Sequence, residues 1–164
     1  MAKGDVFWID TGGKTNVPVR TFRTRAGETA INPGEPLLIS NLGDITQPYV
    51  IALTDGKPSV GADYFIGVSA NSSSHTASAD GNVDVYLETP GTIWAAKAKT
   101  TTTFDSAGDV NDNLFYRIVF DLTSSTYTAD VAADVATRGL RVVGGDHTTY
   151  TVYFTACDGA SWDR

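Results

Sequence analysis

Short stretches of strand-favouring residues, each bounded by turn residues, constrain the fold of this chain more than any other feature. From residue 17 onward, stretches rich in Val, Ile, Thr, Tyr and Phe are separated by clusters of Gly, Pro, Asn, Asp and Ser. The first set of residues favours strands and the second favours turns. The pattern predicts about ten strands, at residues 17–23, 36–40, 49–53, 64–70, 83–88, 92–99, 114–121, 125–128, 140–143 and 149–156.

Within several of these stretches, apolar and polar residues alternate. At residues 83–88, Val83 and Val85 alternate with Asp84 and Glu88. Such alternation places one face of a strand in a core and the other in water. The sequence therefore predicts an all-β fold, a compact β-barrel or β-sandwich of about ten short strands.

One stretch of the sequence favours a helix. Residues 128–138 contain four alanines, but two valines and the following Gly139 limit any helix to a few turns. We therefore expect at most one short helix. Two further stretches, at residues 71–79 and 99–103, are small and polar and predict exposed loops.

The length of 164 residues suits one domain. We expect residues 17–164 to form a single β domain, in which residues 100–164 could form a separate lobe. Residues 1–16 differ from the rest, because the apolar triplet Phe7, Trp8 and Ile9 is followed by a polar, Gly-containing connector. Two interpretations are open for this segment: an extended N-terminal arm that docks on another chain, and an ordinary first strand of the sheet.

Charge is distributed unevenly along the chain. Five cations against three anions give residues 1–28 a net charge of +2, and the remaining residues carry −9, for a total of −7. A strongly acidic chain is poorly suited to the phosphate backbone, so we expect no nucleic-acid partner. The basic leader instead favours an acidic protein surface as its partner.

The sequence disfavours a membrane-spanning or secreted protein and a protein with an intrachain disulfide. The sequence has no apolar run long enough to cross a bilayer and no signal-peptide core near its start, which predicts a protein made in the cytoplasm and without a membrane partner. A single cysteine, Cys157, excludes an intrachain disulfide.

Residues suited to catalysis are few. The two histidines, His75 and His147, lie in a Ser-rich stretch and in a turn sequence, where we expect solvated side chains. The triplet Asp-Thr-Gly at residues 10–12 resembles that of aspartic proteases, but a linker-like sequence follows it. The sequence therefore predicts no enzyme, no catalytic residue and no cofactor. An enzyme that depends on Asp10 or Cys157 is the alternative.

One segment is rich in oxygen-bearing side chains. Residues 105–113 read Asp-Ser-Ala-Gly-Asp-Val-Asn-Asp-Asn, and such oxygens are the ligands that calcium prefers. An EF-hand that starts at Asp109 would place Leu114 where glycine is needed and Phe120 where the bidentate glutamate is needed. An Asx-rich turn ahead of a strand explains the same residues without an ion, so we predict no metal site.

Three stretches together resemble a known family. They are Ile-Asn-Pro-Gly-Glu-Pro-Leu-Leu at 31–38, Ala-Asp-Tyr-Phe-Ile-Gly-Val-Ser-Ala at 62–70 and Ala-Asp-Gly-Asn-Val-Asp-Val-Tyr-Leu at 79–87. A turn of Gly-Asp/Glu-Pro type, a Phe-x-Gly-Val-Ala-like strand and a Gly-x-Val-x-Val strand make this part of the chain similar to the small β-rich head decoration proteins of tailed bacteriophages. The resemblance spans about residues 17–99, and no motif from residue 100 onward extends it.

The resemblance implies a capsid cement protein. Such a protein binds the outer surface of the assembled phage head through the major capsid protein, often as a homotrimer, and raises the resistance of the shell to internal DNA pressure. It would act on the outer surface of the virion after synthesis in the host cytoplasm, and it needs no cofactor.

Two groups of residues are the candidate capsid contacts. Phe7, Trp8 and Ile9 could bury apolar area on the shell, by adding a strand to it. Arg20, Arg23 and Arg25 could meet an acidic capsid surface. The simpler alternative for the arginines is a solvated edge strand that they keep soluble. The alternative function is a virion-associated carbohydrate- or receptor-binding β module that uses exposed aromatic side chains and the 105–113 segment.

Overall fold

The computed structural model describes residues 6–10, 17–40, 49–52, 64–89, 91–99, 104–114, 116–123, 126–132 and 139–157. These residues are mostly in strands, which form a closed barrel of five strands and a second sheet, and they include one short helix. The prediction of a compact all-β fold is confirmed.

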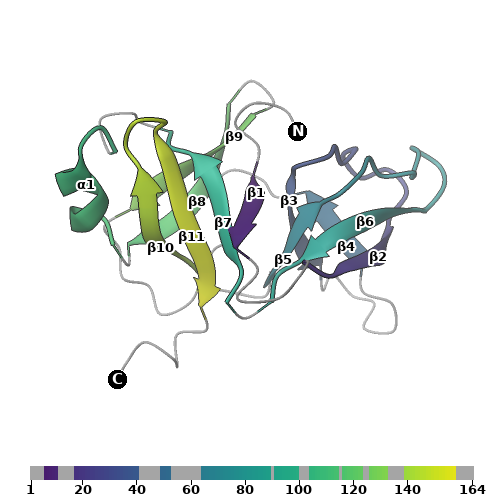
Figure 1. The fold of residues 1–164 in the computed structure, drawn as a ribbon. Coiled ribbons are helices and arrows are strands. Elements are labelled where there is room, and N and C mark those ends of the chain that lie inside the picture. The colour runs from purple at the N-terminus through teal and green to yellow at the C-terminus, as the bar shows by residue number, and fades with distance from the viewer. Residues whose placement is uncertain are drawn as a thin grey trace.

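The first half of the chain forms a closed barrel, which we call the first unit (Figure 1). Its strands are joined in the order β2-β4-β3-β5-β6, and β2 and β4 are parallel whereas the other pairs are antiparallel. The strands are β2 (Val19–Thr24), β3 (Pro36–Ser40), β4 (Tyr49–Ala52), β5 (Tyr64–Ser69) and β6 (Gly81–Leu87). Alternate residues of these strands, together with one loop residue, fill the interior: Ile31, Leu37, Val50, Val83 and Val85.

The second half, together with β1 near the N-terminus, forms a sheet of six strands in the order β1-β7-β11-β10-β8-β9. Its strands are β1 (Phe7–Asp10), β7 (Ile93–Lys97), β8 (Arg117–Thr123), β9 (Thr126–Ala132), β10 (Gly139–Asp146) and β11 (Thr151–Cys157). A parallel bridge between Ala98 and Ala129 joins the end of β7 to β9. Strands β7 to β11, which we call the second unit, therefore curl towards a ring, and β1 is added at the edge of β7.

The two units have the same topology. If β2 to β6 are replaced in chain order by β7 to β11, the order β2-β4-β3-β5-β6 becomes β7-β9-β8-β10-β11, which is the order observed. The strand directions also agree, since the first and third strands of each unit meet in parallel and all other neighbours are antiparallel. The chain is thus a tandem of two five-stranded β units with one topology.

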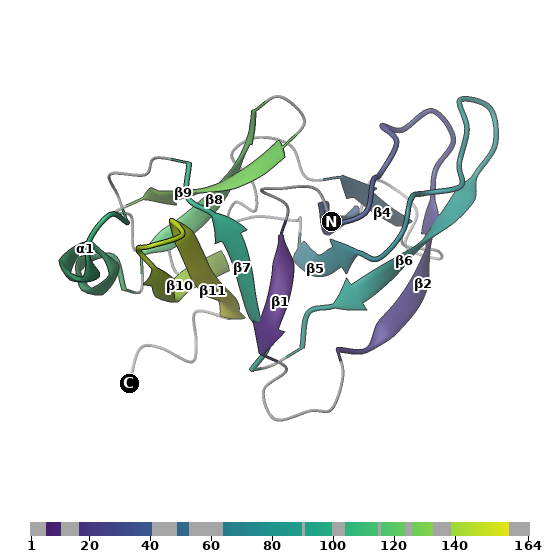
Figure 2. The same ribbon diagram turned by 45° about the horizontal axis from the view of Figure 1, so that its top comes forward.

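The units share a core at the place where they meet. β1 and β7 lie between the barrel and the remainder of the second unit in both views (Figures 1 and 2). One hydrophobic cluster includes Leu38 and Val68 of the barrel together with Trp94 and Phe154 of the second unit. The ring of Phe65 meets that of Trp94 edge-on, with centroids 5.8 Å apart. The Trp94 indole N–H also donates to the Glu88 carboxylate, so the link between the units is fixed by packing and by a hydrogen bond.

The helix lies elsewhere than the sequence predicts. Helix α1 spans Ala107–Asp112, whereas residues 126–132 form β9, and residues 133–138 lie outside the described part of the chain. Pairing of β9 with β8 along its whole length outweighs the weak helical preference of its alanines. α1 begins because the Ser106 side chain accepts a hydrogen bond from the Asp109 backbone N–H. In the described ranges, no helix has both the length and the hydropathy needed to cross a membrane.

The N-terminal segment contributes the edge strand of the second sheet. β1 pairs with β7 so that Phe7 lies opposite Ala95 and Trp8 opposite Trp94. Val6, just before it, is fully buried in the shared cluster and donates its N–H to the Gly34 carbonyl of the barrel at 3.2 Å. Residues 1–5 and 11–16 lie outside the described residues.

Candidate functional site

The three candidate arginines lie together on the first unit. Arg20 and Arg23 are exposed residues of β2, and the exposed Arg25 follows the end of that strand. The structure shows a different partner for each of them. These partners decide how much positive charge the surface offers to another molecule.

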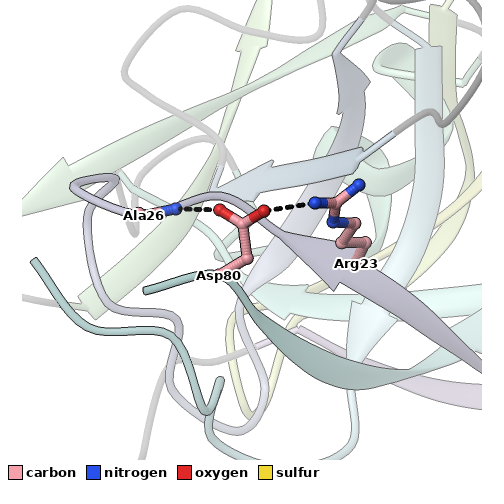
Figure 3. A network of polar contacts seen from close by, with 3 residues as sticks. All are labelled: Arg23, Ala26 and Asp80. Carbon is pink, nitrogen blue, oxygen red and sulfur yellow. Dashed lines mark hydrogen bonds and ion pairs between the residues drawn. The ribbon is translucent and has the colours of Figure 1, made fainter. Parts of the chain in front are cut away.

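The charge of Arg23 is compensated by an acidic residue of the first unit. Its guanidinium forms an ion pair with the Asp80 carboxylate, and the backbone N–H of Ala26 donates to the other carboxylate oxygen at 2.9 Å (Figure 3). These two hydrogen bonds, that from Ala26 above all, lower the pKa of Asp80. Asp80 thus holds the turn after β2 against the start of β6.

Arg25 and Arg20 lie over aromatic rings. The Arg25 guanidinium lies 5.8 Å from the centroid of Tyr49 and donates to the Tyr49 hydroxyl at 3.4 Å, which raises the pKa of Arg25. The Arg20 guanidinium lies 5.5 Å from the centroid of Phe22. Within the part of the chain that the structure describes, Arg20 has no carboxylate partner. Arg20 therefore presents the least compensated charge of the three.

The apolar candidates lie on β1, at the edge of the second unit. Phe7 is half-buried on β1, and Trp8 and Ile9 follow it on the same strand. The sequence names the apolar triplet and the arginines as two groups of candidate capsid contacts. The structure places the triplet on β1 of the six-stranded sheet and the arginines on the first unit.

The polar segment at residues 71–80 packs on the loop that follows β2. The backbone N–H of Ser73 donates to the Ile31 carbonyl at 2.9 Å, and that of Gly27 to the Thr76 carbonyl at 3.0 Å. His75 was expected to be solvated, but it is half-buried, with Nε2 3.0 Å from the Glu28 carbonyl. The segment is thus a fixed part of the barrel surface, and its small side chains permit this close packing.

A second fixed feature is the turn between β10 and β11. Asp146 accepts hydrogen bonds from the Thr148 N–H at 2.9 Å, from the Thr148 hydroxyl at 2.6 Å and from the Thr149 hydroxyl at 2.8 Å. These bonds, led by that from the Thr148 hydroxyl, lower the pKa of Asp146 to about 2. Tyr150 follows with φ of +52° and 41% of its surface exposed. His147, in the same turn, is exposed as expected.

The acidic segment at 105–113 is built around the start of α1. The Ser106 hydroxyl donates to the Asp109 carboxylate at 2.6 Å, in addition to capping the helix. A hydrogen bond with Asp109 raises the pKa of Asp105, and hydrogen bonds from Ser106 and Asp105 lower the pKa of Asp109. Across the described ranges, no group of three or more His, Cys, Asp or Glu side chains could hold a metal ion.

The two residues of the enzyme alternative lie on β1 and β11, which are separated by β7 in the sheet. Asp10 ends β1 opposite Ile93, and Cys157 ends β11 opposite Gly139. Their side chains are outside the described part of the chain.

One residue that the sequence reasoning missed is Arg141, on β10. It is only 7% exposed, and its buried Nη1 atom has no hydrogen-bond partner in the part of the chain that the structure describes. The sequence held a signal, because Arg141 is the single charged residue in the predicted strand at 140–143. Burial of that position could be inferred only from the finished sheet.

Comparison of the chain with protein-family models, with curated proteins and with solved structures finds no match.

Proposed function

We propose that this protein is a structural capsid decoration protein, which binds the outer surface of a phage head and stabilises the shell. The observation that carries the proposal is the tandem of two β units with one topology. An icosahedral shell presents many copies of one capsid protein side by side. A chain that repeats one β unit is suited to such a repeating surface, because two linked contacts bind more tightly than either alone.

The sequence resemblance supports the same function. The three stretches that carry it map to the loop and strand of β3, to β5 and to β6, so they build three neighbouring strands of one barrel. The major capsid protein is then the proposed partner, a homotrimer the proposed assembly and the outer surface of the virion the proposed location.

The proposed arginine contacts should contribute unequally to the binding of an acidic surface. Arg20 has no carboxylate partner among the described residues, and its neighbour Val19 is 54% exposed, which makes it the most exposed large apolar side chain described. Arg23 is already paired with Asp80. We therefore expect Arg20 to contribute more than Arg23 to binding of an acidic surface.

Pelleting with capsids tests the proposed function. Wild-type protein should co-sediment with purified empty capsids of the phage that encodes it, in a saturable manner. Arg20→Ala should weaken binding about tenfold, an effect typical of a lost interfacial charge, and Arg23→Ala should weaken it less. Deletion of residues 1–16 tests the apolar group in the same assay, after circular dichroism has shown that the shortened chain folds. Absence of the wild-type protein from the pellet would contradict the proposal.

A second candidate function rests on the β10–β11 turn. Tyr150 is an exposed aromatic side chain in a turn that Asp146 fixes, and aromatic rings of this kind stack on sugars. Retention of the protein on a glycan array, lost in Tyr150→Ala, would favour a carbohydrate- or receptor-binding module over capsid decoration.

A further inference from the structure

Arg141 is a buried cation that has no counter-charge among the described residues. It lies on β10 between Leu140 and Val142, both of which are fully buried in the shared core. Because successive residues of a strand point to opposite faces, Arg141 lies on the face of the sheet that points away from that core. It is nevertheless only 7% exposed, and its buried Nη1 has no hydrogen-bond partner within the described ranges.

The neighbouring strands supply no negative charge at this register. Arg141 is opposite Thr155 on β11 and opposite Arg117 on β8. The Thr155 hydroxyl donates to the Thr92 carbonyl at 2.9 Å, so its proton is already used. A neutral hydroxyl and a second arginine therefore occupy the positions at which an acid would compensate Arg141.

This arrangement is unfavourable unless an anion joins it. A guanidinium does not lose its proton in a protein, so it cannot escape burial by becoming neutral. A buried charge without a partner destabilises the fold. An arginine side chain also presents its N–H groups as a planar fork that matches the oxygens of a carboxylate or a phosphate.

We propose that the face of the second unit around Arg141 binds a small oxyanion, a carboxylate or a phosphate. The site is independent of the capsid proposal, because it rests on the burial and the strand register of Arg141 alone. The ligand is defined by its chemistry: at least two oxygens on one atom, with a negative charge.

Thermal unfolding in matched salts tests the site. The melting temperature is measured in sodium chloride, sodium acetate and sodium phosphate at one pH and one ionic strength. An anion present at ten times its dissociation constant should raise the melting temperature of the wild-type protein by roughly 3–5 °C over chloride. A rise with acetate identifies a carboxylate site, and a rise with phosphate alone identifies a phosphate site. Equal melting temperatures in all three salts would overturn the proposal.

Two arginine variants make the assignment specific. Arg141→Met should lose the anion-dependent rise, and its melting temperature in chloride should not fall below that of the wild type, because the uncompensated charge is gone. Arg20→Met is the matched control, since Arg20 is an exposed arginine on the other unit, and it should keep the rise. A rise that persists in Arg141→Met means that the anion binds elsewhere and contradicts the site.

A measurement on the wild-type protein covers the case in which Arg141→Met does not fold. The side-chain N–H resonances of Arg141 should shift on titration with the effective anion and saturate at the concentration that raises the melting temperature. Unshifted Arg141 resonances in the presence of a stabilising anion would refute the proposal.

Discussion

Lys97 and Thr149 in the second unit repeat the relationship between Arg23 and Asp80 in the first. Arg23 pairs in register with Asn82 and reaches back two residues to the Asp80 carboxylate. Lys97 pairs in register with Thr151 and likewise reaches back two residues, donating to the Thr149 carbonyl at 2.6 Å. In both units, a cation on the first strand thus binds a residue that lies just before the start of the last strand.

The two units should unfold together, because Trp94 joins their cores. Trp94 is fully buried, contacts Phe65 of the barrel and donates to Glu88. Trp94→Ala should lower the free energy of unfolding by about 3–5 kcal/mol, the range for loss of a large buried aromatic side chain. Urea denaturation followed by far-ultraviolet circular dichroism measures this, and the wild type should show one transition.

Val19→Ala is the control for the Trp94 variant, since Val19 is exposed and its truncation should change stability by less than about 0.5 kcal/mol. Two separate wild-type transitions, with only the second displaced by Trp94→Ala, would show that the units are energetically independent.

Adjacent glycines of β10 should respond differently to the same substitution. A Cβ atom at Gly145 would lie 2.9 Å from a Phe104 ring carbon and 2.9 Å from the Thr151 carbonyl oxygen. At Gly144, the nearest atom would be a Tyr153 ring carbon at an ordinary 3.6 Å. Gly145→Ala should therefore cost about 1–3 kcal/mol of stability, whereas Gly144→Ala should be neutral or slightly stabilising. Equal losses in urea denaturation would contradict the packing of Phe104 on β10.

The strand pattern made much of this fold predictable from the sequence. The stretch predicted at 36–40 coincides with β3, and that at 83–88 overlaps β6, because alternating Val residues there face a barrel core. The helix prediction at 128–138 was wrong where the structure describes it, since strand pairing decided the conformation of β9. Local propensity carries no information about such a long-range partner.

The tandem could not be predicted, because equivalent positions hold residues of different size and charge. The inward pair Val83 and Val85 of β6 corresponds to Val152 and Phe154 of β11, since each pair lies on the core face of the last strand of its unit. The charged Asp80 likewise corresponds to the neutral Thr149. For the candidate site, the sequence identified the arginines of β2, but only the structure reveals that Asp80 compensates Arg23.

Acid should lower the stability of the folded protein, in part through protonation of Asp146. Its pKa is lowered to about 2 in the folded protein, against about 3.9 for an unfolded aspartate. The stabilisation that this shift provides is complete above the unfolded pKa and is lost as the pH falls through the folded pKa. Asp146→Asn should therefore reduce the loss of stability between about pH 4 and pH 2, measured by urea denaturation at each pH. Asp112→Asn is the control on exposed α1, and an unchanged acid profile in Asp146→Asn would rule out this contribution.

Tyr150 should be replaceable without loss of stability. It holds φ at +52°, a left-handed conformation that costs most side chains about 1–2 kcal/mol and that asparagine adopts more readily. Tyr150→Asn should leave the melting temperature unchanged or raise it, whereas Tyr153→Asn, at a half-buried position of β11, should lower it. A clear loss of stability in Tyr150→Asn would show that the ring is needed for the turn itself.

Cryo-electron microscopy of empty capsids, with and without added protein, tests the capsid proposal most directly. The proposal predicts ordered additional density on the outer surface, with two adjoining β units in each copy and with the shell rupturing at a higher temperature. Bare capsids at saturating protein concentration, with an unchanged rupture temperature, would contradict it.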